Sequence, residues 1–430
     1  MTKKFFVKKR VFSLVLAVFT IVFGVLLTSC GTDDETEFEV TPETAAIDYT
    51  RFAGTTLNIY NWGEYISDGT EGSIDVNKEF TKLTGIEINY TNFSTNEDMY
   101  SKLKSGATNY DIIIPSDYMV ERLISEGMLH KLDFNNIPNY KYISEDFKDL
   151  YYDANNEYSV PYLVGMVGII YNTKMVDYTP DSWSVLRDPN LKDKILMINN
   201  PRDAFAIAQF MLGIDLNTQD ASEWEQAKNW LLEQKNYVKA YVMDEIYNIM
   251  ESGSAAVAPY YAGDFLSMYE NNPDLAFAYP KEGTNIFVDA MCIPKSSTNK
   301  EAAELYINFL LDPNVALQNA ETVCYATPNT AVVEMEEYQE FLAEIHPDAM
   351  DILYPNYEEL YPGKDSRDYY FRNLPQSTLD NVAKLWSELK IASTEDSDSY
   401  IIYILCILAV VLLAGLVVYL KIRKRRRANA

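Results

Sequence analysis

The 430-residue sequence has few of the side chains on which metal centres, histidine relays and disulfide frameworks depend. It contains two histidines, His130 and His346, which lie far apart, and four cysteines, none of them in a C-x-x-C pair. These scarcities argue against a histidine-rich metal site, a zinc knuckle and a disulfide framework. We therefore expect no metal, no cofactor and no catalytic residue. Whether Cys292 and Cys324 form a disulfide or stay as two buried thiols is open.

Basic residues are also scarce, and they are unevenly placed. The chain has 36 lysines and arginines against 63 acidic residues, a formal charge of −27. Five basic residues lie within the first ten positions and six within 421–427, which leaves 25 basic against 63 acidic residues elsewhere. This excess of negative charge argues against nucleic acid as a partner and attracts cations. Solubility alone is the alternative reason for it.

The N-terminus carries the pattern of a lipoprotein signal. A basic start precedes an apolar run over 11–27, and the small residues before Cys30 resemble a bacterial lipobox. We predict a signal peptide over 1–30, with lipidation at Cys30, and a linker over 31–53. An uncleaved anchor helix with an incidental cysteine is the alternative.

A second uncharged, apolar run covers residues 400–420. As a helix, its 21 residues span about 31 Å, close to the thickness of a bilayer core. Because the basic tail over 421–430 follows at once, the positive-inside rule places that tail in the cytoplasm. We predict a linker over 393–399, a transmembrane helix over 400–420, and a main domain on the extracellular or periplasmic face of the cell membrane.

The middle of the chain alternates between strand and helix patterns, which is typical of an α/β fold. Its length favours two domains, and the alternation predicts parallel sheets whose strands carry ligands at their carboxyl ends. Ser94 and Glu97 form a capping-box pattern before one of the helices. The predicted strands cover 56–60, 86–90, 111–114, 194–199, 255–261 and 286–291, and the predicted helices begin near Val76, Ser94, Arg202, Ala221 and Glu301.

Side chains at the predicted strand ends are aromatic and anionic, with no obvious base or nucleophile. Carboxylates compensate a desolvated ammonium, and each aromatic face attracts a cation by about 0.5–2 kcal/mol. The set therefore fits an organic cation, above all a chain of amines joined by methylenes. Its members are Trp62, Glu64, Tyr65, Ser116, Asp117, Tyr118, Asn200, Asp203, Tyr260, Tyr261, Phe287, Asp289 and Tyr325.

Some of these residues also have a purely structural explanation. Asp203, in a first helical turn, complements the helix dipole, and Ser116 and Asp117 are placed to cap a helix. Glu64 and Asp289 are less easily explained in this way, because a buried carboxylate needs a partner.

Seven short motifs resemble those of the bacterial spermidine/putrescine-binding proteins of ABC importers. They occur in the expected order over about 54–390, and together they are specific, although each alone is weak. The motifs are Tyr60-Asn61-Trp62-Gly63-Glu64-Tyr65, the run from Tyr110 to Tyr118, Ser159-Val160-Pro161-Tyr162, Pro280-Lys281-Glu282-Gly283, Val288-Asp289, Ile307-Asn308-Phe309-Leu310 and Tyr325-Ala326-Thr327-Pro328-Asn329.

The resemblance implies a two-lobed periplasmic-binding-protein fold of type II, in which the lobes close on the ligand about a hinge. Lobe 1 is then expected at 54–167 and 287–335, and lobe 2 at 168–286 and 336–392. The function implied is that of a monomeric receptor, not an enzyme, which captures polyamines and delivers them to an ABC permease.

The same resemblance assigns roles to individual residues. The family carries a binding glutamine in its last segment, and both Arg372 and Gln376 lie near this position. We assign the role to Gln376, because an arginine that lined the site would disfavour a cation. By position, Trp62, Glu64 and Tyr65 match the first binding loop, Ser116 and Tyr118 the second, Asp203 a carboxylate near one amine, Asp289 the main anionic partner and Tyr325 a lining tyrosine.

The sequence departs from the family's pattern at four positions. Asn200 stands where the family has an aspartate, and Gly63 replaces a small hydroxyl residue. Tyr261 and Phe287 stand where those proteins use tryptophans. The departures leave the affinity and the choice among polyamines open.

Two other functions stay open. One is a receptor of the same fold for another cation or small solute. The other is an extracellular hydrolase with paired carboxylates such as Glu64 and Asp289, against which stands the missing proton-donor signature.

Overall fold

The computed structural model describes residues 38–363 and 369–392, and the statements below concern these residues. Within them, the residues from Val40 onward belong to one compact unit built on a nine-stranded sheet. The strand order is β2-β1-β3-β9-β4-β7-β5-β6, and β8 pairs with β4 beside this path. The strands are β1 Thr56–Trp62, β2 Glu87–Phe93, β3 Ile112–Ile113, β4 Ser159–Asn172, β5 Ile195–Ile198, β6 Val238–Val242, β7 Val257–Tyr261, β8 Leu275–Ala278 and β9 Ile286–Cys292.

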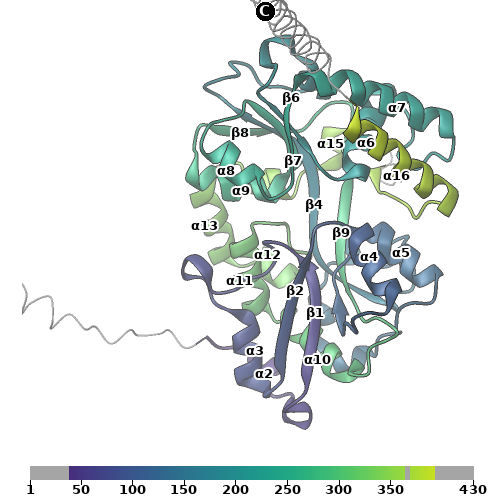
Figure 1. Ribbon diagram of the computed structural model, residues 1–430. Coiled ribbons are helices and arrows are strands. Elements are labelled where there is room, and N and C mark those ends of the chain that lie inside the picture. Colours follow the sequence, from purple (N-terminus) through teal and green to yellow (C-terminus); the bar gives the residue numbers. More distant parts are fainter. Residues whose placement is uncertain (1–37, 364–368, 393–430) are drawn as a thin grey trace, which may run out of the picture. The chain divides into compact units, whose positions relative to one another are not determined.

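The long strand β4 joins two halves of this sheet (Figure 1). Its residues 159–166 pair with β9, and its residues 167–172 pair with β7 and β8. The first half therefore contains β1, β2, β3, β9 and the start of β4, and the second half contains β5–β8 and the end of β4. All 14 residues of β4 are buried. Because a strand buried on both faces shows no polar alternation, the periodicity of the sequence did not reveal it.

The prediction of parallel sheets is wrong at the junction of the two halves. β1 runs parallel to β2 and β3, and β5 runs parallel to β6 and β7, as expected. β9 and β4, however, run antiparallel to their neighbours, so the sheet is mixed. These two strands carry the chain between the halves without the crossover helix that would keep the strands parallel.

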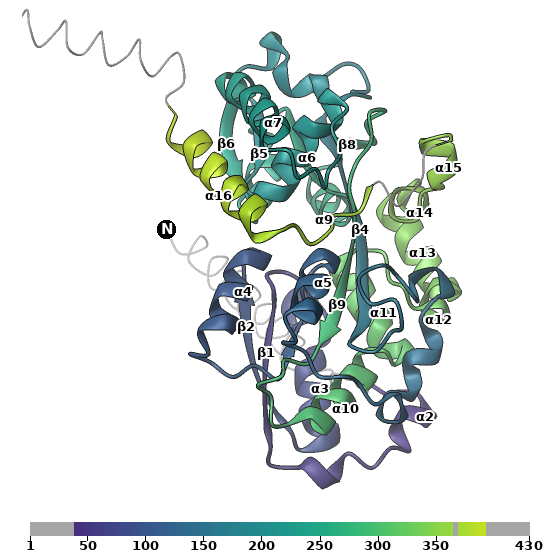
Figure 2. The same cartoon turned by 90° about the vertical axis from the view of Figure 1, so that its right-hand side faces the viewer.

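Helices flank the sheet in both halves (Figures 1 and 2), and the last of them, α16, packs on α7 of the second half. The helices are α2 Pro42–Ala45, α3 Val76–Thr84, α4 Asn96–Ser105, α5 Asp117–Ser125, α6 Pro201–Leu212, α7 Ala221–Gln234, α8 Ile246–Glu251, α9 Ala262–Asn271, α10 Lys300–Leu310, α11 Pro313–Val323, α12 Thr330–Val333, α13 Glu336–Ile345, α14 Ala349–Leu353, α15 Tyr357–Leu360 and α16 Gln376–Ile391.

Local capping explains where α4 begins, because its N-cap lies one residue after the predicted cap. The Thr95 side chain accepts a hydrogen bond from the Asp98 backbone N–H, so Thr95 is the N-cap and the capping box of Ser94 and Glu97 is wrong. Ser94 is thereby left at the end of β2, where it faces the pocket described below. The helix is terminated by Gly106, its C-cap, in a left-handed conformation with φ of 64°.

Cys292 and Cys324 are both buried, and both are free thiols. The predictions for the signal at 1–30, the linker at 393–399, the transmembrane helix at 400–420 and the tail at 421–430 lie outside the described residues. Within 38–363 and 369–392, no helix combines the length and the apolar character needed to cross a bilayer.

Candidate ligand-binding site

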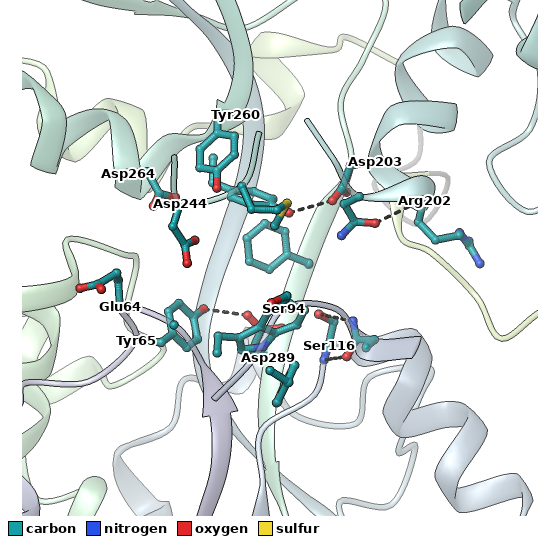
Figure 3. Close-up of a pocket in the computed structure, with 18 of the residues that line it drawn as sticks. Glu64, Tyr65, Ser94, Ser116, Arg202, Asp203, Asp244, Tyr260, Asp264 and Asp289 are labelled. Carbon is teal, nitrogen blue, oxygen red and sulfur yellow. Dashed lines mark hydrogen bonds between the residues drawn. The ribbon is translucent and has the colours of Figure 1, made fainter. Parts of the chain in front are cut away.

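A pocket lies where the carboxyl ends of parallel strands from both halves of the sheet meet (Figure 3). Trp62, Phe93 and Tyr261 are the last residues of β1, β2 and β7. Asn200 and Asp244 each follow the end of a strand, β5 and β6, by two residues. Because the carboxyl ends of parallel strands share one edge, loops that are far apart in the sequence place their side chains around one cavity.

The structure brings twelve of the fourteen candidate ligand-binding residues named from the sequence to this pocket. That these residues bind a ligand stays a prediction, but they share one cavity, as the hypothesis of an organic-cation site requires. They are Trp62, Glu64, Tyr65, Ser116, Tyr118, Asn200, Asp203, Tyr260, Tyr261, Phe287, Asp289 and Tyr325.

Asp117 and Gln376 do not line the pocket. The fully buried carboxylate of Asp117 accepts hydrogen bonds from the backbone N–H groups of Tyr118 at 2.7 Å and Val288 at 3.3 Å. Asp117 thus binds the backbone of β9 outside the pocket lining. Burial raises the pKa of Asp117 to about 8. The side-chain oxygen of Gln376 accepts from Arg122 at 2.7 Å, which joins the start of α16 to α5.

Asp289 lies in the middle of β9 rather than at a strand end, and it is 3% exposed. The Tyr65 hydroxyl donates to its Oδ2 at 2.7 Å, but no described atom bonds its Oδ1. Burial raises the pKa of Asp289 to about 7. A cation in the pocket would give Oδ1 a partner and would stabilise the ionised form of the carboxyl group.

Asp203, in the first turn of α6, is held by two donors. The Tyr261 hydroxyl donates to its Oδ2 at 2.8 Å, and the Asn285 amide donates to its Oδ1 at 3.0 Å. Burial raises the pKa of Asp203 to about 6, and the two hydrogen bonds act in the opposite direction. Asn200 is the N-cap of the same helix, because its side-chain oxygen accepts from the Arg202 backbone N–H at 3.1 Å.

Asp264, in the first turn of α9, is a lining carboxylate that the sequence did not reveal. It accepts hydrogen bonds from the hydroxyls of Tyr247 and Tyr325. Burial raises its pKa to about 6, and the nearby charge of Asp244 acts in the same direction. Tyr325, which was predicted to line the pocket, therefore also orients the Asp264 carboxylate through its hydroxyl.

Aromatic rings form the walls of the pocket, and two of them lie directly on glycine backbone. A Cβ atom at Gly165 would lie 2.3 Å from the ring of Phe287, and one at Gly263 would lie 2.1 Å from the ring of Tyr325. Only glycine fits under these rings. The ring pairs are Trp62 with Phe93 at 4.5 Å between centroids, Tyr65 with Tyr325 at 5.2 Å and Tyr261 with Phe287 at 5.4 Å.

Acidic side chains outnumber basic ones around the cavity. Among the described residues its lining contains one basic side chain, Arg202, whose guanidinium lies 4.4 Å from the Phe371 ring centroid and donates to Asn217 at 3.3 Å. Figure 3 shows this guanidinium turned away from the carboxylates. The interior field is therefore negative, which suits a cationic guest. The lining carboxylates are Glu64, Asp203, Asp244, Asp264 and Asp289.

Sequence reasoning missed several lining residues because two strands were missed or cut short. The strand predicted over 86–90 extends to Phe93, so the residues after it were not recognised as strand-end residues. β6 was not predicted, although recognising it would have pointed to the two residues that follow it. The missed residues are Phe93, Ser94, Asn96, Arg202, Met243, Asp244, Asp264, Asn285 and Phe371.

Comparison with known proteins defines the class to which this site belongs. A family model of bacterial extracellular solute-binding proteins matches residues 107–350. The spermidine/putrescine-binding periplasmic protein of Escherichia coli is 35% identical over 317 residues, which cover 73% of this chain and 87% of the relative. The corresponding protein of Salmonella typhimurium is 36% identical over 280 residues, covering 64% of this chain and 78% of the relative.

Solved structures share the fold. A spermidine/putrescine ABC transporter protein from Listeria monocytogenes has a TM-score of 0.71 at 36% identity, covering 78% of this chain and 99% of that chain. A spermidine/putrescine ABC transporter substrate-binding protein from Streptococcus pneumoniae has a TM-score of 0.62 at 32% identity, with the same two coverages.

The chain belongs to the bacterial extracellular solute-binding proteins, and the resemblance found in its sequence is confirmed. It is therefore an extracellular or periplasmic receptor for a solute, with the mixed α/β fold of periplasmic binding proteins, and not an enzyme.

Proposed function

We propose that this receptor captures a polyamine, spermidine or putrescine, in the pocket and delivers it to an ABC permease. The observation that carries the proposal is the composition of the cavity, in which five carboxylates and a lining of aromatic rings accompany a single arginine that is turned away. The buried Oδ1 of Asp289, which has no hydrogen-bond partner among the described residues, supports an ammonium as its partner. The names of the relatives support the same ligand class.

Each part of a polyamine finds a matching surface in this cavity. The ammonium groups form charge-assisted hydrogen bonds with carboxylates, and ring faces add about 0.5–2 kcal/mol each by cation–π attraction. The methylenes between the amines are buried against the rings, at about 0.8 kcal/mol per CH₂. A neutral sugar would leave the carboxylates uncompensated.

Transport requires that the ligand change the relative position of two lobes. We assign lobe 1 to 54–167 and 287–335, and lobe 2 to 168–286 and 336–392. The change of partner along β4, from β9 up to residue 166 to β7 from residue 167, supports a hinge at this junction. A ligand that contacts both lobes favours the closed form by its differential affinity, and the closed form docks on the permease.

The proposal includes an attachment to the membrane at both ends of the chain. A lipid on Cys30 and a span over 400–420 would keep a monomeric receptor at the outer face of the membrane, with the tail over 421–430 in the cytoplasm. The lipobox pattern and the charge-free apolar run support this arrangement.

Calorimetric titration of the detergent-solubilised full chain tests the ligand. We expect one-site binding of spermidine or putrescine with a dissociation constant below about 1 μM, equivalent to about −8 kcal/mol. Glucose, the control, should give no heat of binding, and the polyamine should be recovered unchanged. Absence of binding by both polyamines would contradict the proposal and favour a receptor for another solute.

A further inference from the structure

Asp244 is a carboxylate of the second half of the sheet whose side chain reaches the first half. It follows β6 by two residues, and its Oδ2 lies 3.0 Å from the position that a Cβ of Gly63 would occupy. Gly63 follows β1 and directly precedes Glu64. Figure 3 shows Asp244 on the same side of the pocket as Glu64 and Tyr65, with Asp203 on the opposite side.

The Asp244 carboxylate has no hydrogen bond and no ion pair among the described residues. By contrast, Asp203, Asp264 and Asp289 each accept at least one side-chain hydrogen bond. Partial burial raises the pKa of Asp244, and the charge of Glu245 acts in the same direction. An ionised side chain in this position is therefore poorly compensated until a cation arrives.

Two carboxylates that line the same cavity at different depths each have an oxygen without a hydrogen-bond partner among the described residues. One is Asp289, with its buried Oδ1, and the other is the exposed Asp244. In Figure 3, Asp203, Asp289 and Asp244 follow one another across the pocket. A flexible ligand that satisfies this series must carry positive charge at more than one point along its length.

We infer that Asp244 forms a subsite for a terminal ammonium at the exposed end of the pocket, and that this subsite makes the receptor favour a triamine over a diamine. The inference rests on the proposed polyamine function and specifies it. A triamine places ammonium groups at Asp203, at Asp289 and at Asp244, whereas a diamine occupies the two buried positions and leaves Asp244 empty.

The glycine at position 63 is part of the subsite. A side chain here would meet the Asp244 carboxylate at 3.0 Å and displace it by a few tenths of an ångström. Gly63→Ala therefore perturbs the position of the carboxylate without removing its charge, while Asp244→Asn removes the charge and keeps the shape.

The test compares spermidine and putrescine binding to the full chain by calorimetry. Asp244→Asn should weaken spermidine binding about threefold to fivefold, and putrescine binding less than twofold, since an exposed ion pair contributes modestly. Gly63→Ala should weaken spermidine binding by a smaller factor. The matched control is Glu245→Gln, which removes the same charge one residue away, outside the pocket lining, and should leave both affinities within twofold.

The outcomes separate this inference from the function on which it rests. If the wild-type chain binds neither polyamine, the proposed function fails. If it binds them but Asp244→Asn changes neither affinity, changes both equally, or acts no more strongly than Glu245→Gln, the subsite is refuted. Unchanged melting temperatures ensure that the comparison is made on folded variants.

Discussion

The two ends of the pocket hold their carboxylates in different ways. Asp289 and Asp203 are 3% and 4% exposed, and tyrosine hydroxyls donate to both. At the other end, Asp244 and Glu64 are exposed to solvent. Since burial strengthens an ion pair but costs desolvation, we expect the buried end to govern affinity, and the exposed end to govern which ligand length is accepted and how fast the ligand arrives.

The largest effect that would test this contrast is expected from Asp289→Asn. The change removes the charge of a buried acceptor whose Oδ1 has no protein partner, so a ligand ammonium loses its main counter-charge. We expect the polyamine affinity to fall at least tenfold, about 1.4 kcal/mol, in calorimetric titration.

Tyr65→Phe is the matched control for this change. It removes the hydroxyl that donates to Asp289 Oδ2 and leaves the charge in place. We expect a smaller loss than in Asp289→Asn. Equal losses would show that the orientation of the Asp289 carboxylate by the Tyr65 hydroxyl, rather than its charge, decides binding. Unchanged binding in Asp289→Asn would place the ammonium elsewhere.

The second effect in size is a dependence of affinity on pH. Burial raises the pKa of Asp289 to about 7 and that of Asp203 to about 6 in the ligand-free protein, and a bound cation favours their ionised forms. The complex therefore binds fewer protons than the free receptor. The affinity should fall about tenfold as the pH falls from 8 to 6. Titrations across this range check it, and a flat profile would contradict the assignment.

Stability of the ligand-free protein should change with pH in the opposite direction. The pKa values of Asp117, Asp289 and Asp203 are raised above the unfolded value of 3.8, so the folded state binds more protons than the unfolded state. Their contribution to the free energy of unfolding thus increases as the pH falls from 8 to 6. Thermal melts without ligand measure it, and Asp289→Asn should reduce the slope.

The smallest of these effects is expected from Asp203→Asn. Its carboxylate already has two protein donors, Tyr261 and Asn285, so a ligand cation gains less from it than from Asp289. We expect a loss of about fivefold in affinity. Tyr261→Phe, which removes one donor and leaves the charge, should cost less. A loss in Asp203→Asn larger than in Asp289→Asn would reverse the order of the two buried positions.

The sequence indicated the residues of the pocket wherever a recognisable motif followed a predicted strand. The motif around Trp62 and the run before Ser116 both lie at strand ends that the sequence indicated, and Asp203 lies in the first turn of a helix that was predicted. Asp244 and Asp264 were missed for different reasons. β6 was not recognised before Asp244, and Asp264 lies inside α9, where an acidic residue resembles an ordinary first-turn charge.

The sequence by itself determined the α/β class, the approximate positions of six strands and five helices, the excess of negative charge and the family, because periodicity, capping residues and short motifs act over a few residues. Only the tertiary structure decided that β4 and β9 run antiparallel between the halves, that Asp117 and Gln376 face away from the cavity, and that Asp244 reaches Gly63. These features depend on contacts between segments far apart in the chain, and no local pattern encodes the direction in which such a side chain points.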